Sequence, residues 1–72
     1  MSYKESQIAF ETPTHWVLAE KGLFTVFKNT ATHSVSDSAY DNLGLAICRA
    51  AYLSGAPMKA RDAETLAAAY LS

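Results

Sequence analysis

The segment from Asp41 to Ser54 constrains the fold most, because it has the pattern of a helix with almost no polar face. Its internal polar side chains are Asn42, Arg49 and Tyr52. One apolar stripe has the spacing that faces a sheet. A second stripe, which lies off that face, consists of Leu45, Cys48 and Tyr52. In a chain of 72 residues, such a helix needs cover on a second side, from the tail of the chain or from another molecule.

Capping signals predict that this helix runs over residues 39–54. Ser36, Asp37 and Ser38 can each cap it, and Asp41 stands three residues after Ser38, at the acidic position of a capping box. Gly55 follows the last turn, where glycine commonly ends a helix. Gly44, inside the helix, indicates either the close approach of another backbone or a tolerated imperfection.

The strongest strand signal is a hairpin made of residues 15–20 and 23–28, which flank a turn at Lys21-Gly22. Both segments are rich in β-branched and aromatic residues. Alternation places Trp16 and Leu18 on one face and Val17 on the other. Because both faces carry large apolar groups, the hairpin needs two covers, or one cover and a partner.

Two further elements complete the expected fold. A turn at residues 29–31 leads to a short polar strand over residues 32–36. An alanine-rich tail predicts a second helix that begins between residues 57 and 62, although residues 57–61 are also compatible with an extended segment. We therefore expect one α+β domain spanning residues 1–72. It has a small antiparallel sheet, either a hairpin or a three-stranded meander, packed on one long helix, with a second helix at the carboxyl end.

The pentapeptide Ala-Ala-Tyr-Leu-Ser occurs twice, at residues 50–54 and 68–72. Gly55 and Pro57 lie between the copies, so the repeat indicates two similar helix ends and not one continuous rod. Chance in an alanine-rich chain and ancestral duplication are both possible origins.

Composition excludes several functional classes. Six Lys and Arg against seven Asp and Glu leave a net charge of −1, and the cations do not cluster, so nucleic acid is not an expected ligand. The single cysteine, Cys48, allows no internal disulfide and favours a reducing compartment. Residues 1–7 lack the apolar stretch of a signal peptide, and no apolar run is long enough to cross a bilayer. The expected location is the cytoplasm.

Candidate catalytic groups are few, and their spacing matches no catalytic or metal-binding pattern. His15, His33 and Cys48 could in principle supply a dyad or metal ligands. Cys48 is better explained as an inert small hydrophobic residue, and the two histidines as exposed or hydrogen-bonded residues. The Ser, His and Asp residues within 32–38 are close neighbours on one strand, whereas triads combine separate elements. We therefore expect no enzyme activity, no cofactor and no metal site.

Aromatic residues are numerous for a chain of this size, with four tyrosines, three phenylalanines and one tryptophan, among them Tyr3. Tyrosine and tryptophan often anchor interfaces, although ordinary core packing explains them equally well. The residues that we expect to contact a protein partner are Trp16, Phe24, Phe27, Leu45, Arg49, Tyr52 and Tyr70. The partner is another protein, or a second copy of the chain in a homodimeric structural domain.

Three stretches carry a resemblance to known proteins: residues 22–29, residues 32–35 and residues 45–53. Over about residues 15–53 the chain resembles small uncharacterised accessory proteins of phages, prophages and plasmids. The resemblance supplies no catalytic residue. It implies a non-enzymatic module that binds and modulates or inhibits a host protein, including components of defence systems such as CRISPR.

Overall fold

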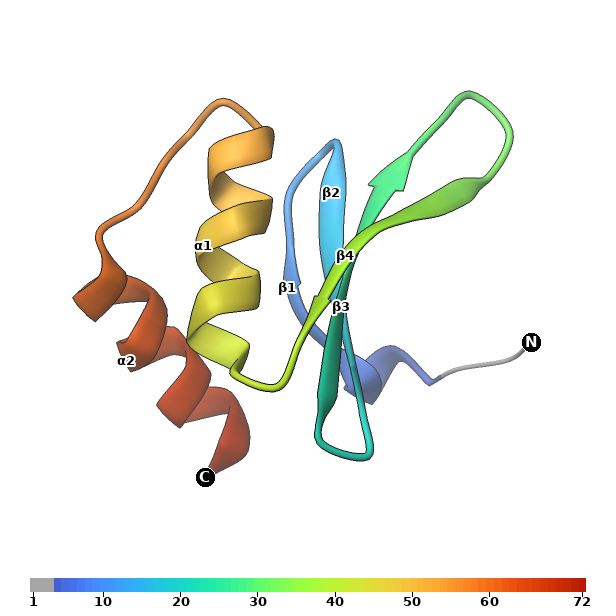
Figure 1. Ribbon diagram of the computed structural model, residues 1–72. Coiled ribbons are helices and arrows are strands. Elements are labelled where there is room, and N and C mark those ends of the chain that lie inside the picture. Colours follow the sequence, from blue (N-terminus) through green and yellow to red (C-terminus); the bar gives the residue numbers. More distant parts are fainter. Residues whose placement is uncertain (1–3) are drawn as a thin grey trace.

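The computed structural model describes residues 4–72 (Figure 1). Residues 1–3, which include Tyr3 and the start of the segment that lacks a signal-peptide pattern, lie outside the described residues. The elements are η1 (Glu5–Gln7), β1 (Ile8–Glu11), β2 (His15–Glu20), β3 (Leu23–Asn29), β4 (Ser34–Tyr40), α1 (Leu43–Leu53) and α2 (Ala60–Leu71). The strands form one antiparallel sheet in the order β1-β2-β3-β4. The expected α+β class is confirmed.

The predicted hairpin is β2 and β3. Trp16 pairs with Phe27 and Val17 pairs with Val26, so the two faces are those that alternation predicts. Lys21 and Gly22 have φ values of 51° and 80°, and two positive φ values in succession are typical of a type I′ turn. The turn twists in the same sense as the strands, which fixes the register.

The sheet has one strand more than the largest number expected. β1 pairs with β2, with Ile8 opposite Leu18 and Phe10 opposite Val17. Pro13 does not break this ladder because it lies in the connecting turn, where the Thr12 N–H donates to the His15 carbonyl at 2.7 Å.

The predicted start of the first helix at residue 39 is wrong. Residues Ser34–Tyr40 form β4, in which Tyr40 pairs with Phe24, so the expected short strand is longer and lies later in the chain. The N-cap is Asn42, whose Oδ1 accepts from the Leu45 N–H at 3.1 Å. The residues predicted to cap the helix, Ser36, Asp37 and Ser38, belong to the strand. Asn42 satisfies the free N–H after the strand has ended.

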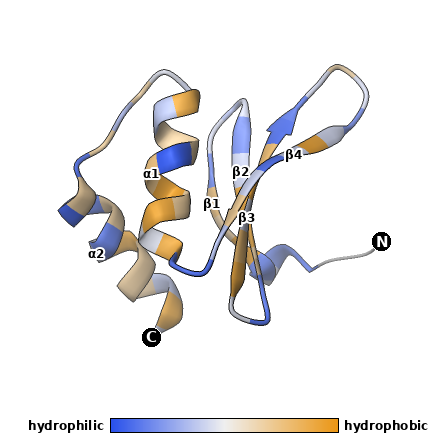
Figure 2. Cartoon of the chain, viewed as in Figure 1, coloured by the Kyte–Doolittle hydropathy of each residue, from blue (hydrophilic) through white to orange (hydrophobic). Residues whose placement is uncertain are grey.

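The core lies between the sheet and α1. Val17 and Val26 on the sheet and Ile47 on α1 are fully buried, and Leu43 and Ala50 pack with them. Both helices lie on this face of the sheet, with α1 nearer to the strands (Figure 1). Hydrophobic residues continue along most of α1, whereas the first turns of α2 include hydrophilic ones (Figure 2). Of the two expected covers for a second side of the first helix, the tail supplies one in part, because α2 packs on α1 through the buried Ala63 and Ala67 while Leu45 and Tyr52 stay exposed.

The repeated pentapeptide ends both helices, as expected. α1 ends at Leu53 and α2 at Leu71, and the following serines make the same two contacts. Ser54 Oγ donates to the Ala51 carbonyl and Ser72 Oγ to the Ala69 carbonyl, at 2.8 and 2.9 Å. Their N–H groups donate to the carbonyls four residues earlier. The start of α2 at Ala60 falls within the predicted window, after a non-helical Met58 and Lys59.

Candidate protein-binding surface

The second apolar stripe of α1 is only partly covered. Leu45 and Tyr52 are 56% and 64% exposed, and Cys48 between them is half-buried. Residues separated by three and seven positions lie on one side of a helix, so the three side chains form a row. The row stays open because α2 packs on α1 through its buried Ala63 and Ala67, which join the main core. This row of exposed apolar side chains is the first part of the candidate site.

A groove between the two helices adjoins this row. A larger depression, of about 640 Å³, and a smaller one, of about 140 Å³, share Asn42, Gly44 and Glu64. Leu45 and Cys48 line the smaller depression, and Leu71, which is 63% exposed, lines the larger. We call the two depressions together the α1–α2 groove. It joins exposed apolar side chains from both helices into one surface.

Gly44 sets the distance between the helices at the middle of this groove. A Cβ atom on Gly44 would lie 3.3 Å from Glu64 Cγ and 3.7 Å from Glu64 Cα. The close approach of another backbone, which the glycine indicated, is therefore present, and that backbone is α2. Because position 44 has no side chain, α2 can approach α1 closely here, and Gly44 and Glu64 line both depressions.

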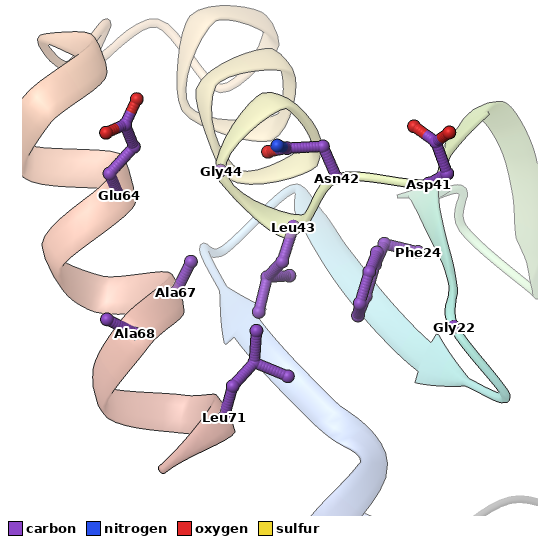
Figure 3. Close-up of a pocket in the computed structure, with 10 residues that line it drawn as sticks. All are labelled: Gly22, Phe24, Asp41, Asn42, Leu43, Gly44, Glu64, Ala67, Ala68 and Leu71. Carbon is purple, nitrogen blue, oxygen red and sulfur yellow. The ribbon is translucent and has the colours of Figure 1, made fainter.

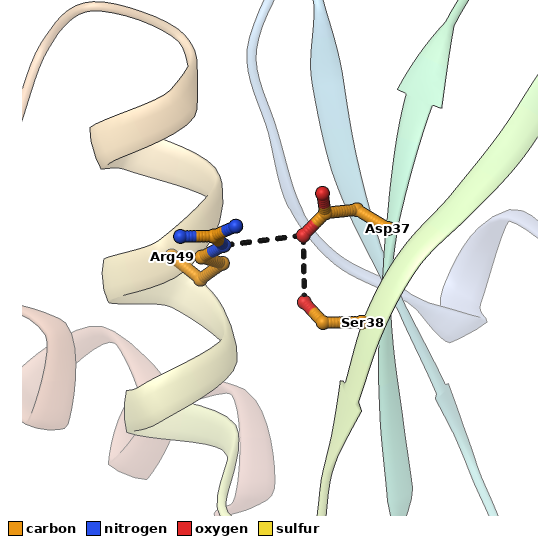
Figure 4. Close-up of polar contacts among 3 residues, drawn as sticks. All are labelled: Asp37, Ser38 and Arg49. Carbon is orange, nitrogen blue, oxygen red and sulfur yellow. Dashed lines mark hydrogen bonds and ion pairs between the residues drawn. The ribbon is translucent and has the colours of Figure 1, made fainter.

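An ion pair ties α1 to the edge strand beside the exposed row. The Arg49 Nε donates to Asp37 Oδ2 at 3.1 Å, and the Ser38 hydroxyl donates to the same oxygen at 2.8 Å (Figure 4). These two hydrogen bonds hold the pKa of Asp37 below its usual range, against the opposing effect of burial. The hydrogen bond from the Ser38 hydroxyl has the larger effect and the one from Arg49 the smaller. Arg49 is thus engaged within the chain, although its side chain remains 41% exposed.

The Asp37→Asn variant is expected to lose stability in a pH-dependent way. Because the folded-state pKa of Asp37 is depressed, its contribution is present above the ordinary value of 3.8 and is lost as the pH falls through the lower, folded-state value. Urea unfolding of both proteins from about pH 5 down to about pH 3 measures this. The difference in free energy of unfolding should shrink toward acid, and Ser38→Ala should show part of the effect. A difference in free energy of unfolding that does not change with pH would contradict the lowered pKa of Asp37.

The structure divides the predicted partner-contacting residues into separate places. Leu45, Arg49 and Tyr52 lie together on α1. Trp16 and Phe27 lie on the sheet face away from the helices, with ring centroids 4.6 Å apart, and Trp16 is buried. Phe24 is also buried, although it lines the larger depression of the α1–α2 groove. The Tyr70 hydroxyl donates to the Ser6 carbonyl at 2.6 Å, which ties α2 to η1.

Each of the two histidines has a hydrogen-bond partner of its own. His15 is buried with its Nδ1 2.8 Å from Thr14 Oγ1, while His33 is exposed with its Nδ1 2.9 Å from Thr32 Oγ1. Within residues 4–72, His, Cys, Asp and Glu side chains form no group of three that could hold a metal ion. In the same part of the chain, neither helix has the length and apolar character needed to cross a bilayer.

Asp41, Glu64 and Leu71 are surface residues that sequence reasoning missed. In the sequence, Asp41 resembles a helix-capping residue and Leu71 an ordinary apolar position of the tail. The available signal is the spacing of Glu64, Ala68 and Leu71, which places them on one side of α2. The position of that side relative to α1 depends on how the helices cross. No family model, curated protein or solved structure matches this chain in the comparisons made.

Proposed function

We propose that this chain is a small non-enzymatic protein-binding module that modulates or inhibits a host or phage protein by occupying part of its surface. The observation that carries the proposal is the exposed row of α1, in which Leu45 lines the α1–α2 groove and Tyr52 extends the row away from it. Apolar side chains that are half or more exposed and adjoin a concave surface are typical of docking sites. The class of partner, a host or phage protein, is the one that a resemblance to accessory proteins of mobile elements implies.

The Leu45→Gln and Tyr52→Gln variants are expected to keep the fold and to lose partner binding by about tenfold or more. Both side chains are mostly exposed, and glutamine is a good helix former. Leu66→Gln is the matched control, because Leu66 is an exposed leucine of α2 that lines neither depression. Circular dichroism checks the fold, and retention of a partner from a lysate of the natural host by the tagged protein checks binding.

A photo-crosslinking residue at position 52 identifies the contact directly. One protein should be crosslinked from position 52 and not from position 32, which is exposed on the β3–β4 turn. Equal crosslinking from both positions, or retention of the partner by the Leu45→Gln variant, would contradict the proposal.

A homodimeric structural domain is the second candidate. The observation that favours it is β4, an edge strand of seven residues without proline or lysine, since such an edge can pair with a second copy. Sedimentation at micromolar concentration decides between the two. A monomer supports the binding module, whereas a dimer that crosslinks only to itself supports the alternative.

A further inference from the structure

The larger depression of the α1–α2 groove combines an apolar floor with acidic sides. Phe24, Leu43 and Leu71 lie close together in its centre, while Glu64 stands on one side and Asp41 on the other (Figure 3). The three apolar side chains come from β3, α1 and α2, so the floor is formed only in the folded chain. An apolar side chain of a partner could rest on this floor between the two carboxylates.

The depression carries two carboxylates and no basic group among the residues that line it. Within residues 4–72 the ion pairs are Arg49 with Asp37 and Arg61 with Asp62, so neither Asp41 nor Glu64 is paired. Both residues are exposed, which leaves their charges hydrated and free to meet a partner. Electrostatic complementarity therefore requires the bound segment to supply the positive charge.

The same charges disfavour a second copy of the chain as the occupant. In a twofold dimer the same patch faces itself, so the Asp41 and Glu64 of one copy would approach those of the other. Like charges brought together across an interface are unfavourable, and the lining offers no cation to offset them. A basic segment of a different protein satisfies both the apolar floor and the acidic sides.

We infer that the larger depression takes a basic amphipathic segment of a partner protein. This inference rests on the proposed function and specifies the chemistry of the ligand. An apolar side chain of the segment packs mainly on Leu71, which is exposed, above the largely buried Phe24 and Leu43. Flanking Lys or Arg side chains pair with Asp41 and Glu64. The apolar contact supplies most of the affinity, whereas the charge pairs orient the segment and speed its association.

Three synthetic peptides test the inference by titration of the ¹⁵N-labelled full chain. The first is a short amphipathic peptide with leucines on one face and arginines on the flanks. The second has glutamate in place of each arginine, and the third has serine in place of each leucine. Amide shift changes should be confined to residues around 22–24, 41–44 and 64–71, should be much weaker with the second and third peptides than with the first, and should decrease with added salt.

A double variant, Asp41→Asn with Glu64→Gln, should bind the first peptide about fivefold to tenfold more weakly, as expected for the loss of two exposed charge pairs. Glu5→Gln with Glu11→Gln is the matched control, because it removes the same charge from exposed positions outside the α1–α2 groove. Unchanged affinity in the first double variant, equal binding of the acidic peptide, or shift changes elsewhere would overturn the inference.

Failure of this inference can be distinguished from failure of the proposed function. If the partner crosslinked from position 52 is retained equally by the Asp41→Asn, Glu64→Gln variant, the chain is a binding module but the acidic depression does not select the partner. If the chain crosslinks only to itself, the proposed function fails and this inference fails with it.

Discussion

Replacement of Trp16 by alanine is expected to lower the free energy of unfolding by about 3–5 kcal/mol, a range typical of large aromatic residues that are removed from buried sites. Trp16 is only 7% exposed, its ring stacks on Phe27, and its indole N–H lies 3.1 Å from Asn29 Oδ1 and 3.2 Å from Ser34 Oγ. A chain of 72 residues has a total stability of about 4–11 kcal/mol. Urea unfolding followed by far-ultraviolet circular dichroism should therefore show a marginal or unfolded variant.

Trp16→Phe separates packing from hydrogen bonding. It keeps an aromatic ring over Phe27 but removes the N–H donor, while Ser34 Oγ still donates to Asn29 Oδ1 at 2.8 Å. We expect a loss of about 1 kcal/mol. A loss in Trp16→Ala no larger than in Trp16→Phe would show that the ring is not a main support of this sheet face.

The role of Trp16 also corrects the argument that the hairpin needs a cover on both faces. Alternation does place large apolar groups on each face, and α1 covers only one of them. On the other face, Trp16 and Leu18 are nevertheless buried. Contacts between neighbouring strands, such as the stack of Trp16 on Phe27, bury part of this face without a second helix. The apolar content of this face therefore does not by itself require a partner.

Short sequence patterns predicted correctly those elements that depend only on neighbouring residues. The β2–β3 hairpin follows from alternation and from a turn that contains glycine, and the end of α1 follows from Gly55, whose φ is 87°. The start of α1 was misplaced because several consecutive residues can cap a helix equally well. Pairing of Tyr40 with Phe24 extends the strand and leaves Asn42 as the cap. Strand pairing is a tertiary effect that capping preferences do not contain.

The candidate surface was predicted only in part, because it too depends on tertiary contacts. Leu45 and Tyr52 were expected to need cover from the tail or from another molecule because they lie off the sheet-facing stripe, and in the folded chain both are exposed. The α1–α2 groove depends on how α2 crosses α1, which brings Glu64 to Gly44 from 20 positions along the chain. The sequence indicated through Gly44 that a backbone comes close but not which one, so the acidic depression could not be predicted.

Ile47→Ala is the second variant for which we expect a large loss of stability, about 2–5 kcal/mol. Ile47 is fully buried at the centre of the core, where α1 meets Val17 and Val26 of the sheet. Truncation removes apolar contact on both the helix and the sheet sides and leaves a cavity that a small core closes poorly. The midpoint of urea unfolding should fall while the slope of the transition stays the same, because the surface exposed on unfolding is nearly unchanged.

Leu45→Ala is the matched control, because Leu45 lies two residues away on the same helix and is 56% exposed. Its removal should cost no more than about 0.5 kcal/mol, since little buried area is lost and alanine favours the helix. A large loss in Leu45→Ala at micromolar concentration, comparable with that in Ile47→Ala, would mean that Leu45 is buried in solution. A second copy of the chain would then cover the exposed row of α1, and the dimer would replace the binding module as the function of this surface.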